Sequence, residues 1–336
     1  MSPSSSGARA PPGPVVAEFD RPRVPHEPIS VAVVADPHLS VGKRGTWKVF
    51  HRTEARLRTA LRIADGGTAA PAADAVVVAG DLTRDGERAE FDRADDLLGD
   101  LTVPWTVLPG NHDVPKAFDD HDGLPLSAFH RRYAGDAVPP EVDALRDAGG
   151  YPMVLRVGAL RVVCLNTAAP PGADFRDTWG GAVGDRGRER LRDLLAAAPE
   201  APRLVVAHHN LGALPEHEPR RPWSRFPAAD ADAVRRLLRT AGVSLAVTAH
   251  HHVPAVREHG GLVELLAPPA CSFPQAILWL RVGPDGTTVR SVPLSGPEGV
   301  TEAYWHAATG SPLGQGILDL VRSRLPTPAT PADRSG

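Results

Sequence analysis

The sequence predicts an α/β protein in which parallel strands alternate with helices. Short continuous apolar runs at residues 31–35, 75–79 and 104–107 are typical of strands buried on both faces of a sheet. Two segments between these runs carry apolar residues at helical spacing. The order strand, helix, strand, helix, strand favours parallel strands that are joined by crossover helices.

The first helix is expected at residues 53–65 and the second after Gly86. Their inward faces are predicted to comprise Leu57, Ala60, Leu61 and Ala64 in the first helix, and Phe91, Ala94 and Leu98 in the second. Residues 123–150 are expected to be mostly loop, with one short helix at 126–133. Next comes a predicted hairpin of strands at 153–157 and 160–166.

The same patterns predict the remaining elements. We expect helices at 185–198 and 231–241, and strands at 204–207, 244–248, 262–266, 276–282 and 287–292. The last three strands are expected to complete a second sheet. Residues 29–295 are predicted to form one catalytic domain, followed by a C-terminal extension with a short helix at 296–324. Residues 1–28 and 325–336 are rich in small residues and proline, so they are predicted to be a disordered leader and tail.

Composition narrows the class of protein. The chain has 336 residues and a formal net charge of −3, which gives no reason to expect a nucleic-acid or membrane partner. Its two cysteines, Cys164 and Cys271, are too few for a disulfide framework and are expected to be buried thiols. Neither a signal-peptide core nor a membrane-spanning stretch is found, so the expected location is cytoplasmic. The sequence does not indicate an oligomeric state.

Polar residues follow the ends of five predicted strands. These candidate metal ligands are Asp36, His38, Asp81, Asn111, His208, His250 and His252. Because ligands bind at the carboxyl ends of strands in α/β sheets, we expect all seven at one edge. For any single histidine, a surface or satisfied core position is the simpler interpretation. That interpretation is given to His26, His51, His121, His130, His217, His259 and His306.

The seven residues form a chemically coherent set of nitrogen and oxygen donors. Such a set suits zinc, manganese or iron, and the absence of a thiolate argues against a structural zinc site. It is large enough for two metal ions if one carboxylate is shared. Asp81 is the expected bridge because Gly80 lets the backbone turn sharply. His250 and His252 alternate in an extended segment, so they can reach one cluster only if the backbone bends.

The stretch Leu108-Pro-Gly-Asn-His-Asp113 follows the third apolar run. Asn111 can offer its amide oxygen to a metal, and His112 can donate a proton to a leaving group. The simpler alternative is a polar turn that caps the next segment.

In order, Asp36-Pro-His38, Gly80-Asp81, Gly110-Asn-His-Asp113, His208 and His250-His-His252 resemble the calcineurin-like metallophosphoesterase superfamily. The resemblance spans residues 31–252 and implies a four-layer α/β/β/α sandwich with a dinuclear metal centre. It implies that Asp36, His38 and His252 hold the first metal, that Asp81 bridges, and that Asn111, His208 and His250 hold the second. It further implies that His112, steadied by Asp113, binds the phosphate and protonates the leaving group. Two metals lower the pKa of a shared water and hold both oxygens of an in-line displacement at phosphorus.

Three positions depart from the usual motifs. Ala249 replaces a glycine, His209-Asn210 stands where His-Pro is common, and Arg84 replaces an aspartate. None of these departures removes a ligand, and His208 is preferred to His209 because it comes first after its strand. Within the superfamily, the chain looks most like the bacterial cyclic-nucleotide-phosphodiesterase-like group.

The leading hypothesis is therefore a metal-dependent phosphodiesterase that holds two metal ions (Mn, Fe or Zn) and acts on a small phosphorylated substrate. A phosphomonoesterase is the rival, because Lys43, Arg44 and Arg84 follow the first two motifs and could join Asn111 and His112 in binding phosphate. The simpler interpretation of these three cations is solvated loop charge. A non-catalytic scaffold on the same fold is the remote alternative, and it predicts eroded ligands, which the sequence does not show.

Overall fold

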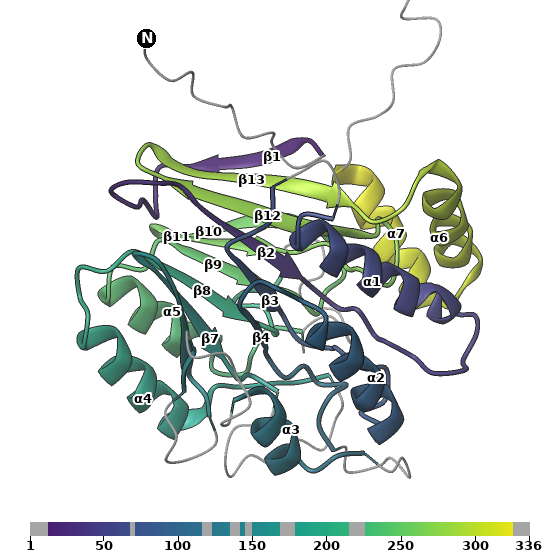
Figure 1. Cartoon of the computed structure of the whole chain (residues 1–336), viewed down its shortest axis with the longest axis horizontal. Coiled ribbons are helices and arrows are strands. Elements are labelled where there is room, and N and C mark those ends of the chain that lie inside the picture. The colour runs from purple at the N-terminus through teal and green to yellow at the C-terminus, as the bar shows by residue number, and fades with distance from the viewer. Residues whose placement is uncertain are drawn as a thin grey trace, which may run out of the picture.

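The computed structural model describes residues 13–67, 71–115, 123–134, 142–144, 150–168, 179–214 and 226–324. Two sheets pack face to face, with helices covering the outer face of each sheet (Figure 1). The predicted four-layer α/β/β/α sandwich is confirmed.

Within the described residues, the first sheet has six strands. In spatial order they are β1 (Val15–Phe19), β13 (Gly286–Pro293), β12 (Ala276–Gly283), β2 (Ile29–Val34), β3 (Ala75–Val78) and β4 (Trp105–Val107). β2, β3 and β4 run parallel, whereas β12 is antiparallel to β2. The three parallel strands thus end at the same edge of the sheet.

The second sheet has seven strands in the described part of the chain. Their order is β10 (Ala255–His259), β11 (Leu262–Leu266), β9 (Leu245–Thr248), β8 (Arg203–Ala207), β7 (Leu160–Leu165), β6 (Met153–Val157) and β5 (Val142–Ala144). β7, β8, β9 and β11 are parallel, and the outer strands are antiparallel to their neighbours.

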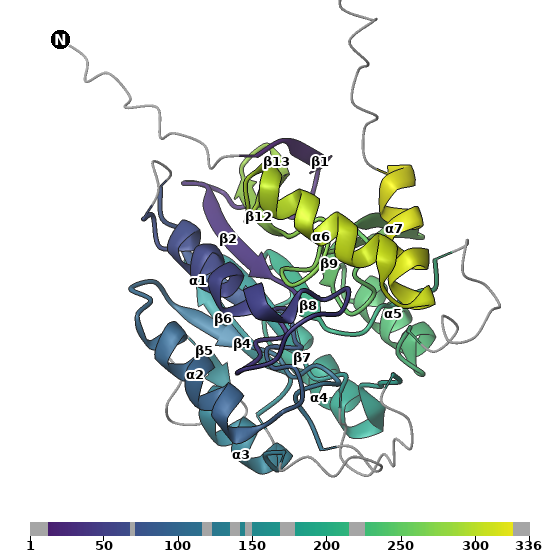
Figure 2. The same ribbon diagram turned by 90° about the vertical axis from the view of Figure 1, so that its right-hand side faces the viewer.

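Seven α-helices lie in the described residues. They are α1 (Thr53–Ala64), α2 (Arg88–Gly99), α3 (Leu126–Tyr133), α4 (Gly184–Ala196), α5 (Ala231–Thr240), α6 (Pro297–Thr309) and α7 (Pro312–Arg324). A short 3₁₀ helix, η1 (Phe50–Arg52), precedes α1. Figure 2 shows α1 and α2 on one side of the sandwich, α4 and α5 on the other, and the α6–α7 pair together at one end. No helix of the described residues is long and apolar enough to cross a membrane.

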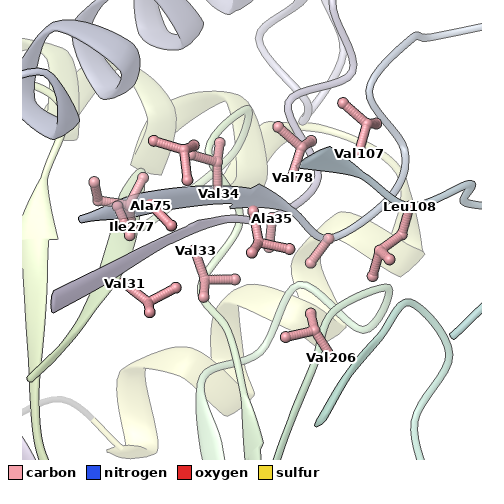
Figure 3. Close-up of a cluster of buried hydrophobic side chains, with 14 of the residues drawn as sticks. Val31, Val33, Val34, Ala35, Ala75, Val78, Val107, Leu108, Val206 and Ile277 are labelled. Carbon is pink, nitrogen blue, oxygen red and sulfur yellow. The ribbon is translucent and has the colours of Figure 1, made fainter. Parts of the chain in front are cut away.

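The main core lies between the two sheets and beneath α1 and α2. Figure 3 shows Val31 and Val33 of β2 on the same side as Val206 of β8, whereas Val34 of β2 and Val78 of β3 point the other way. Because β2 is covered on both faces, a continuous apolar run suits it. α4 and α5 cover a second core on the other sheet, and α6 and α7 pack on a third cluster that includes Trp47.

Several sequence-based expectations about these elements are wrong. Residues 15–19, assigned to a disordered leader, form β1, which pairs with β13. β12 and β13 were expected in the second sheet but belong to the first, because β12 pairs antiparallel with β2. Residues 142–144 and 255–259 form strands that were not foreseen, and residues 296–324 hold two helices rather than one short helix. Residues 1–12, the tail at 325–336, His121 and His217 lie outside the described residues.

Candidate metal centre

The seven candidate ligands follow the carboxyl ends of strands from both sheets. Asp36 and His38 come after β2, Asp81 after β3, and Asn111 after β4 of the first sheet. From the second sheet, His208 follows β8, and the His250–His252 segment follows β9. All seven side chains are buried where these strand ends meet.

Five of the seven candidates have a left-handed backbone conformation. The φ angles are 48° at Asp36, 43° at His38, 49° at Asp81, 66° at His250 and 58° at His252. Such angles are uncommon for residues other than glycine and cluster at functional sites, where the surrounding structure holds them. The two left-handed residues after β9 supply the bend that the sequence required for His250 and His252.

Two glycines let these strand ends approach closely. A Cβ atom on Gly80 would lie 2.4 Å from Nδ1 of His208, and one on Gly110 would lie 2.2 Å from Oδ1 of Asp81. Gly80 also has a φ of 85°. Any larger residue at either position would push a candidate ligand out of place.

The candidates form two groups that share Asp81. In the first, Nε2 of His38 is 3.3 Å from Oδ2 of Asp81 and 3.3 Å from Nε2 of His252, which is 3.5 Å from Oδ1 of Asp36. In the second, Nε2 of His208 is 3.4 Å from Oδ1 of Asp81 and 3.1 Å from Oδ1 of Asn111.

His250 completes the second group, since ligand atoms of Asp81, His208 and His250 lie within 4.8 Å of one another. Asp81 therefore directs one carboxylate oxygen toward each group. This is the position that a bridging carboxylate needs.

Hydrogen bonds to the far side of the rings orient two of the histidines. Nδ1 of His208 is 2.9 Å from the carbonyl oxygen of Ala79, and Nδ1 of His252 is 2.9 Å from Oγ of Ser272. Both rings thus direct Nε2 toward the carboxylates. Metal-ligating histidines are commonly oriented in this way, by a hydrogen bond at the nitrogen that does not bind the metal. His209 instead contacts Thr167, with its Nδ1 2.8 Å from Oγ1, so His208 is the one that faces Asp81.

The electrostatics of the site fit bound cations. Burial raises the pKa of Asp36 well above its usual value, the charge of Asp81 adds to this rise, and the charge of Lys48 opposes it. Burial lowers the pKa of His38, His250 and His252, which keeps these imidazoles neutral and able to bind metal. Nε2 of His250 is buried and has no hydrogen-bond partner among the described residues.

Lys48 already places a cation in this cluster. Its Nζ lies 3.0 Å from Nε2 of His38 and 3.3 Å from Nε2 of His112. Sγ of Cys271 lies 3.9 Å from Nδ1 of His252, and it comes within 4.8 Å of ring nitrogens of both His38 and His252. The seven candidate ligands themselves offer nitrogen and oxygen atoms, a set suited to zinc, manganese or iron.

The sequence profile of calcineurin-like phosphoesterases matches residues 29–254, more than half of the chain. The chain belongs to the calcineurin-like phosphoesterase family. Members of this family are metallophosphoesterases, hydrolases that cleave phosphate esters with bound metal, and the family uses a dinuclear metal centre.

Three proteins illustrate what the chain is similar to. A 3′,5′-cyclic-nucleotide phosphodiesterase from Nostoc sp. is 30% identical over 92 residues, which is 27% of this chain. The match spans only 34% of that relative's length. The structure of a purple acid phosphatase from yellow lupin has a TM-score of 0.50 and 15% identity, covering 79% of this chain and 52% of that one.

A phosphopantetheinyl hydrolase from Mycobacterium tuberculosis has a TM-score of 0.46 and 13% identity, covering 80% and 97% of the two chains. At 15% identity, the likeness to the lupin phosphatase concerns the fold alone.

His112 lies at the cavity of the phosphoesterase, but the contacts of Asp113 differ from those expected. Nδ1 of His112 lies 2.6 Å from the carbonyl oxygen of Arg84, so this carbonyl orients the ring and Nε2 is directed toward Lys48. The Asp113 carboxylate accepts hydrogen bonds from the backbone N–H groups of Gly110, Leu82 and Thr83 and from the Thr83 hydroxyl. Asp113 therefore connects the loop after β3, which carries Asp81, with the loop after β4, which carries Asn111. It does not contact the His112 ring in these hydrogen bonds.

Burial, and then the charge of Asp81, raises the pKa of Asp113 to about 6. The hydrogen bonds from Gly110 and Thr83 oppose this rise because they favour the charged form.

The phosphoesterase has a cavity of about 220 Å³ at the candidate metal centre. Its described lining combines five site residues with an aromatic and aliphatic wall. The lining residues are Asp81, Asn111, His112, His250 and His252, together with Trp47, Lys48, Trp179, Phe226, Leu313 and Ile317. Two of these, Leu313 and Ile317, come from α7, so the C-terminal extension helps to shape the cavity.

The cations proposed from the sequence do not line this cavity. Lys43 and Arg44 are exposed in the loop after β2. The Arg84 guanidinium pairs with Asp85 and lies over the Phe50 ring, 4.7 Å from its centroid. Lys48 was missed because its place in the cavity is set by the packing of Trp47 and Val49 on the α6–α7 cluster, which no local pattern reveals.

Proposed function

We propose that this phosphoesterase hydrolyses a compact phosphodiester of the cyclic-nucleotide type. The partial match to the Nostoc cyclic-nucleotide phosphodiesterase supports this choice. The observation that carries it is the small, aromatic-walled cavity directly at the candidate metal centre. We expect two metal ions, manganese, iron or zinc, as cofactors.

The size and chemistry of the cavity favour a small substrate with a planar group. Its volume of about 220 Å³ is below the ~300–1,000 Å³ typical of pockets for drug-sized ligands. Trp47, Trp179 and Phe226 offer aromatic surfaces on which a nucleobase can stack. Apart from the candidate ligands and His112, Lys48 is the charged residue in the described lining, which suits a substrate with few charges.

Each site residue has a proposed role. Asp36, His38 and His252 would hold one metal, Asn111, His208 and His250 the other, and Asp81 both. Bound metal ions supply a nucleophile from water at neutral pH and neutralise charge on the phosphoryl oxygens. His112, oriented by the carbonyl of Arg84, would donate a proton from Nε2 to the departing oxygen.

A phosphomonoesterase remains the second candidate because of Lys48. Its ammonium lies beside Nε2 of His38, where the first metal would bind, so metal loading has to displace it. The flexible side chain can then reach a phosphate oxygen in the cavity. A dianionic monoester gains more from such a cation than a monoanionic diester does.

The test is a hydrolysis screen in Mn²⁺ with a 3′,5′-cyclic nucleotide and the matching nucleoside monophosphate, using wild type and Lys48→Met. We expect the cyclic diester to be the better substrate and to lose little in the variant. A charged hydrogen bond contributes ~1.5–3 kcal/mol, so residual monoester hydrolysis should fall ~10–100-fold. Preferred hydrolysis of the monoester, with a selective loss in Lys48→Met, would contradict the proposal and favour the monoesterase.

A further inference from the structure

A second cluster of metal-binding side chains lies outside the cavity, between η1 and α6. It consists of His51, Glu302 and His306. The sequence offered no reason to treat either histidine as more than a surface residue, because they are 255 positions apart. The fold brings the two rings together where η1 meets α6.

The three side chains face one another. Nε2 of His51 is 2.9 Å from Oε1 of Glu302, and the His51 and His306 rings have centroids 5.5 Å apart. Glu302 and His306 are four residues apart on α6, so they lie one turn apart on the same face of the helix. One ligand atom from each residue lies within 4.8 Å of the other two.

Two imidazoles and one carboxylate form a donor set that binds Zn²⁺ in proteins, with the fourth position left to water. Zn–N and Zn–O bonds of ~2.0–2.2 Å in tetrahedral geometry place the ligand atoms roughly 3.3 Å apart. The His51–Glu302 separation of 2.9 Å lies below this value, and no pair of ligand atoms is more than 4.8 Å apart. Rotamer adjustments of partly exposed side chains are therefore enough to form the site, since the His51 and Glu302 side chains are 23% and 26% exposed.

We propose that His51, Glu302 and His306 bind a Zn²⁺-like divalent cation, separate from the catalytic metals. Arg52 supports this site, because its Nε lies 3.0 Å from Oε2 of Glu302. The same Nε lies 3.2 Å from Oε1, the oxygen that faces His51, so a metal bound at Oε1 would take the place of this longer contact while the contact to Oε2 holds the carboxylate. The cation would take the place of the direct contact between Nε2 of His51 and Oε1 of Glu302.

Occupancy of this site would brace one wall of the catalytic cavity. η1 directly follows the segment that carries Trp47 and Lys48, both of which line the cavity. α6 packs with α7, which contributes Leu313 and Ile317 to the same lining. A cation bound between His51 and α6 would thus hold these two parts of the wall together.

The test counts Zn²⁺ per chain by elemental analysis, after dialysis of the full-length protein against a series of buffered free Zn²⁺ concentrations. We expect the wild type to bind one equivalent more than His306→Ala and Glu302→Gln. Loss of a direct ligand should weaken this binding more than roughly tenfold, since removal of even a hydrogen-bond partner of a ligand costs that much. His26→Ala, which removes an exposed histidine elsewhere, is the matched control and should keep the wild-type count.

Asp81→Ala separates this site from the catalytic centre. It should lower the catalytic metal content and still lose one further equivalent when His306→Ala is added. The thermal midpoint of the wild type should rise with Zn²⁺ by more than that of His306→Ala. Equal Zn²⁺ counts in wild type, His306→Ala and Glu302→Gln would overturn the proposal and leave an ion pair between η1 and α6.

Discussion

Replacement of His112 by alanine should separate proton donation from metal binding. The ring is held by the Arg84 carbonyl through Nδ1, so Nε2 is the nitrogen that faces the cavity. It is not among the seven proposed ligands, and we expect the bound metal content to stay at the wild-type level. A positioned general acid contributes ~10²–10⁴-fold to the rate, or about 2.7–5.4 kcal/mol of barrier.

The assay compares kcat/KM for two diesters that differ only in their leaving group. With an alkoxide leaving group, which needs a proton, His112→Ala should lose the full ~10²–10⁴-fold. With nitrophenolate, which departs without protonation, the loss should be much smaller. His112→Asn can still donate to the Arg84 carbonyl but cannot transfer a proton, so it should behave like the alanine variant.

Two results would refute this reasoning. A near-normal rate with the alkoxide leaving group would show that His112 is not the acid. An equal loss with both leaving groups would show that the ring binds phosphate or supports the loop instead. Metal content measured on the same samples excludes a trivial loss of the cofactor.

Three further predictions concern buried carboxylates. In Asp113→Asn, the side-chain amide faces the backbone N–H groups of Leu82 and Gly110, so two buried donors lose their acceptor at ~1–3 kcal/mol each. The free energy of unfolding, measured in denaturant, should therefore fall by about 2–6 kcal/mol. An unchanged denaturation midpoint would contradict the role of Asp113 in holding the two loops together. Asp81→Ala should bring bound Mn²⁺ well below two ions per chain by elemental analysis, and unchanged occupancy would exclude a bridge. Burial raises the pKa of Glu90 to about 7, so the folded state binds more protons than the unfolded state between the ordinary value of 4.5 and 7. Stability should therefore fall as the pH rises through this window, by at most about 3 kcal/mol, and Glu90→Gln should remove that part of the slope.

The elements that build the centre could be predicted because their patterns are local. The apolar runs before Asp36, Asp81 and Asn111 indicate buried strands whatever their neighbours are. β1 could not be predicted, since residues 15–19 owe their extended form to pairing with β13, more than 260 residues away. For the same reason, the pattern of β12 and β13 indicates strands without showing that β12 joins β2.

Within the site, residue types were easier to predict than contacts. Donors that follow parallel strands meet at one edge of their own sheet, so the seven candidate ligands could be named, although only the packing of the two sheets brings the two edges together. His112 and Asp113 are neighbours in sequence, which suggested that one steadies the other. In the structure, the turn directs the Asp113 carboxylate to the backbone N–H groups of Gly110 and Thr83, and the His112 imidazole to the carbonyl of Arg84. These two directions depend on the backbone geometry of the turn, which the sequence does not reveal.

β1 also affects how the chain can be shortened. It covers the outer edge of β13, and further contacts secure the same segment, with the backbone N–H of Val24 bonded to Gly283 and the Arg290 guanidinium to Gly13. A chain that began at residue 29 would leave the N–H and C=O groups of an eight-residue strand open to solvent. Open edges of this kind template pairing between molecules. Removal of residues 1–28 should therefore cause self-association, visible by light scattering, whereas removal of residues 1–12 should leave the edge protected.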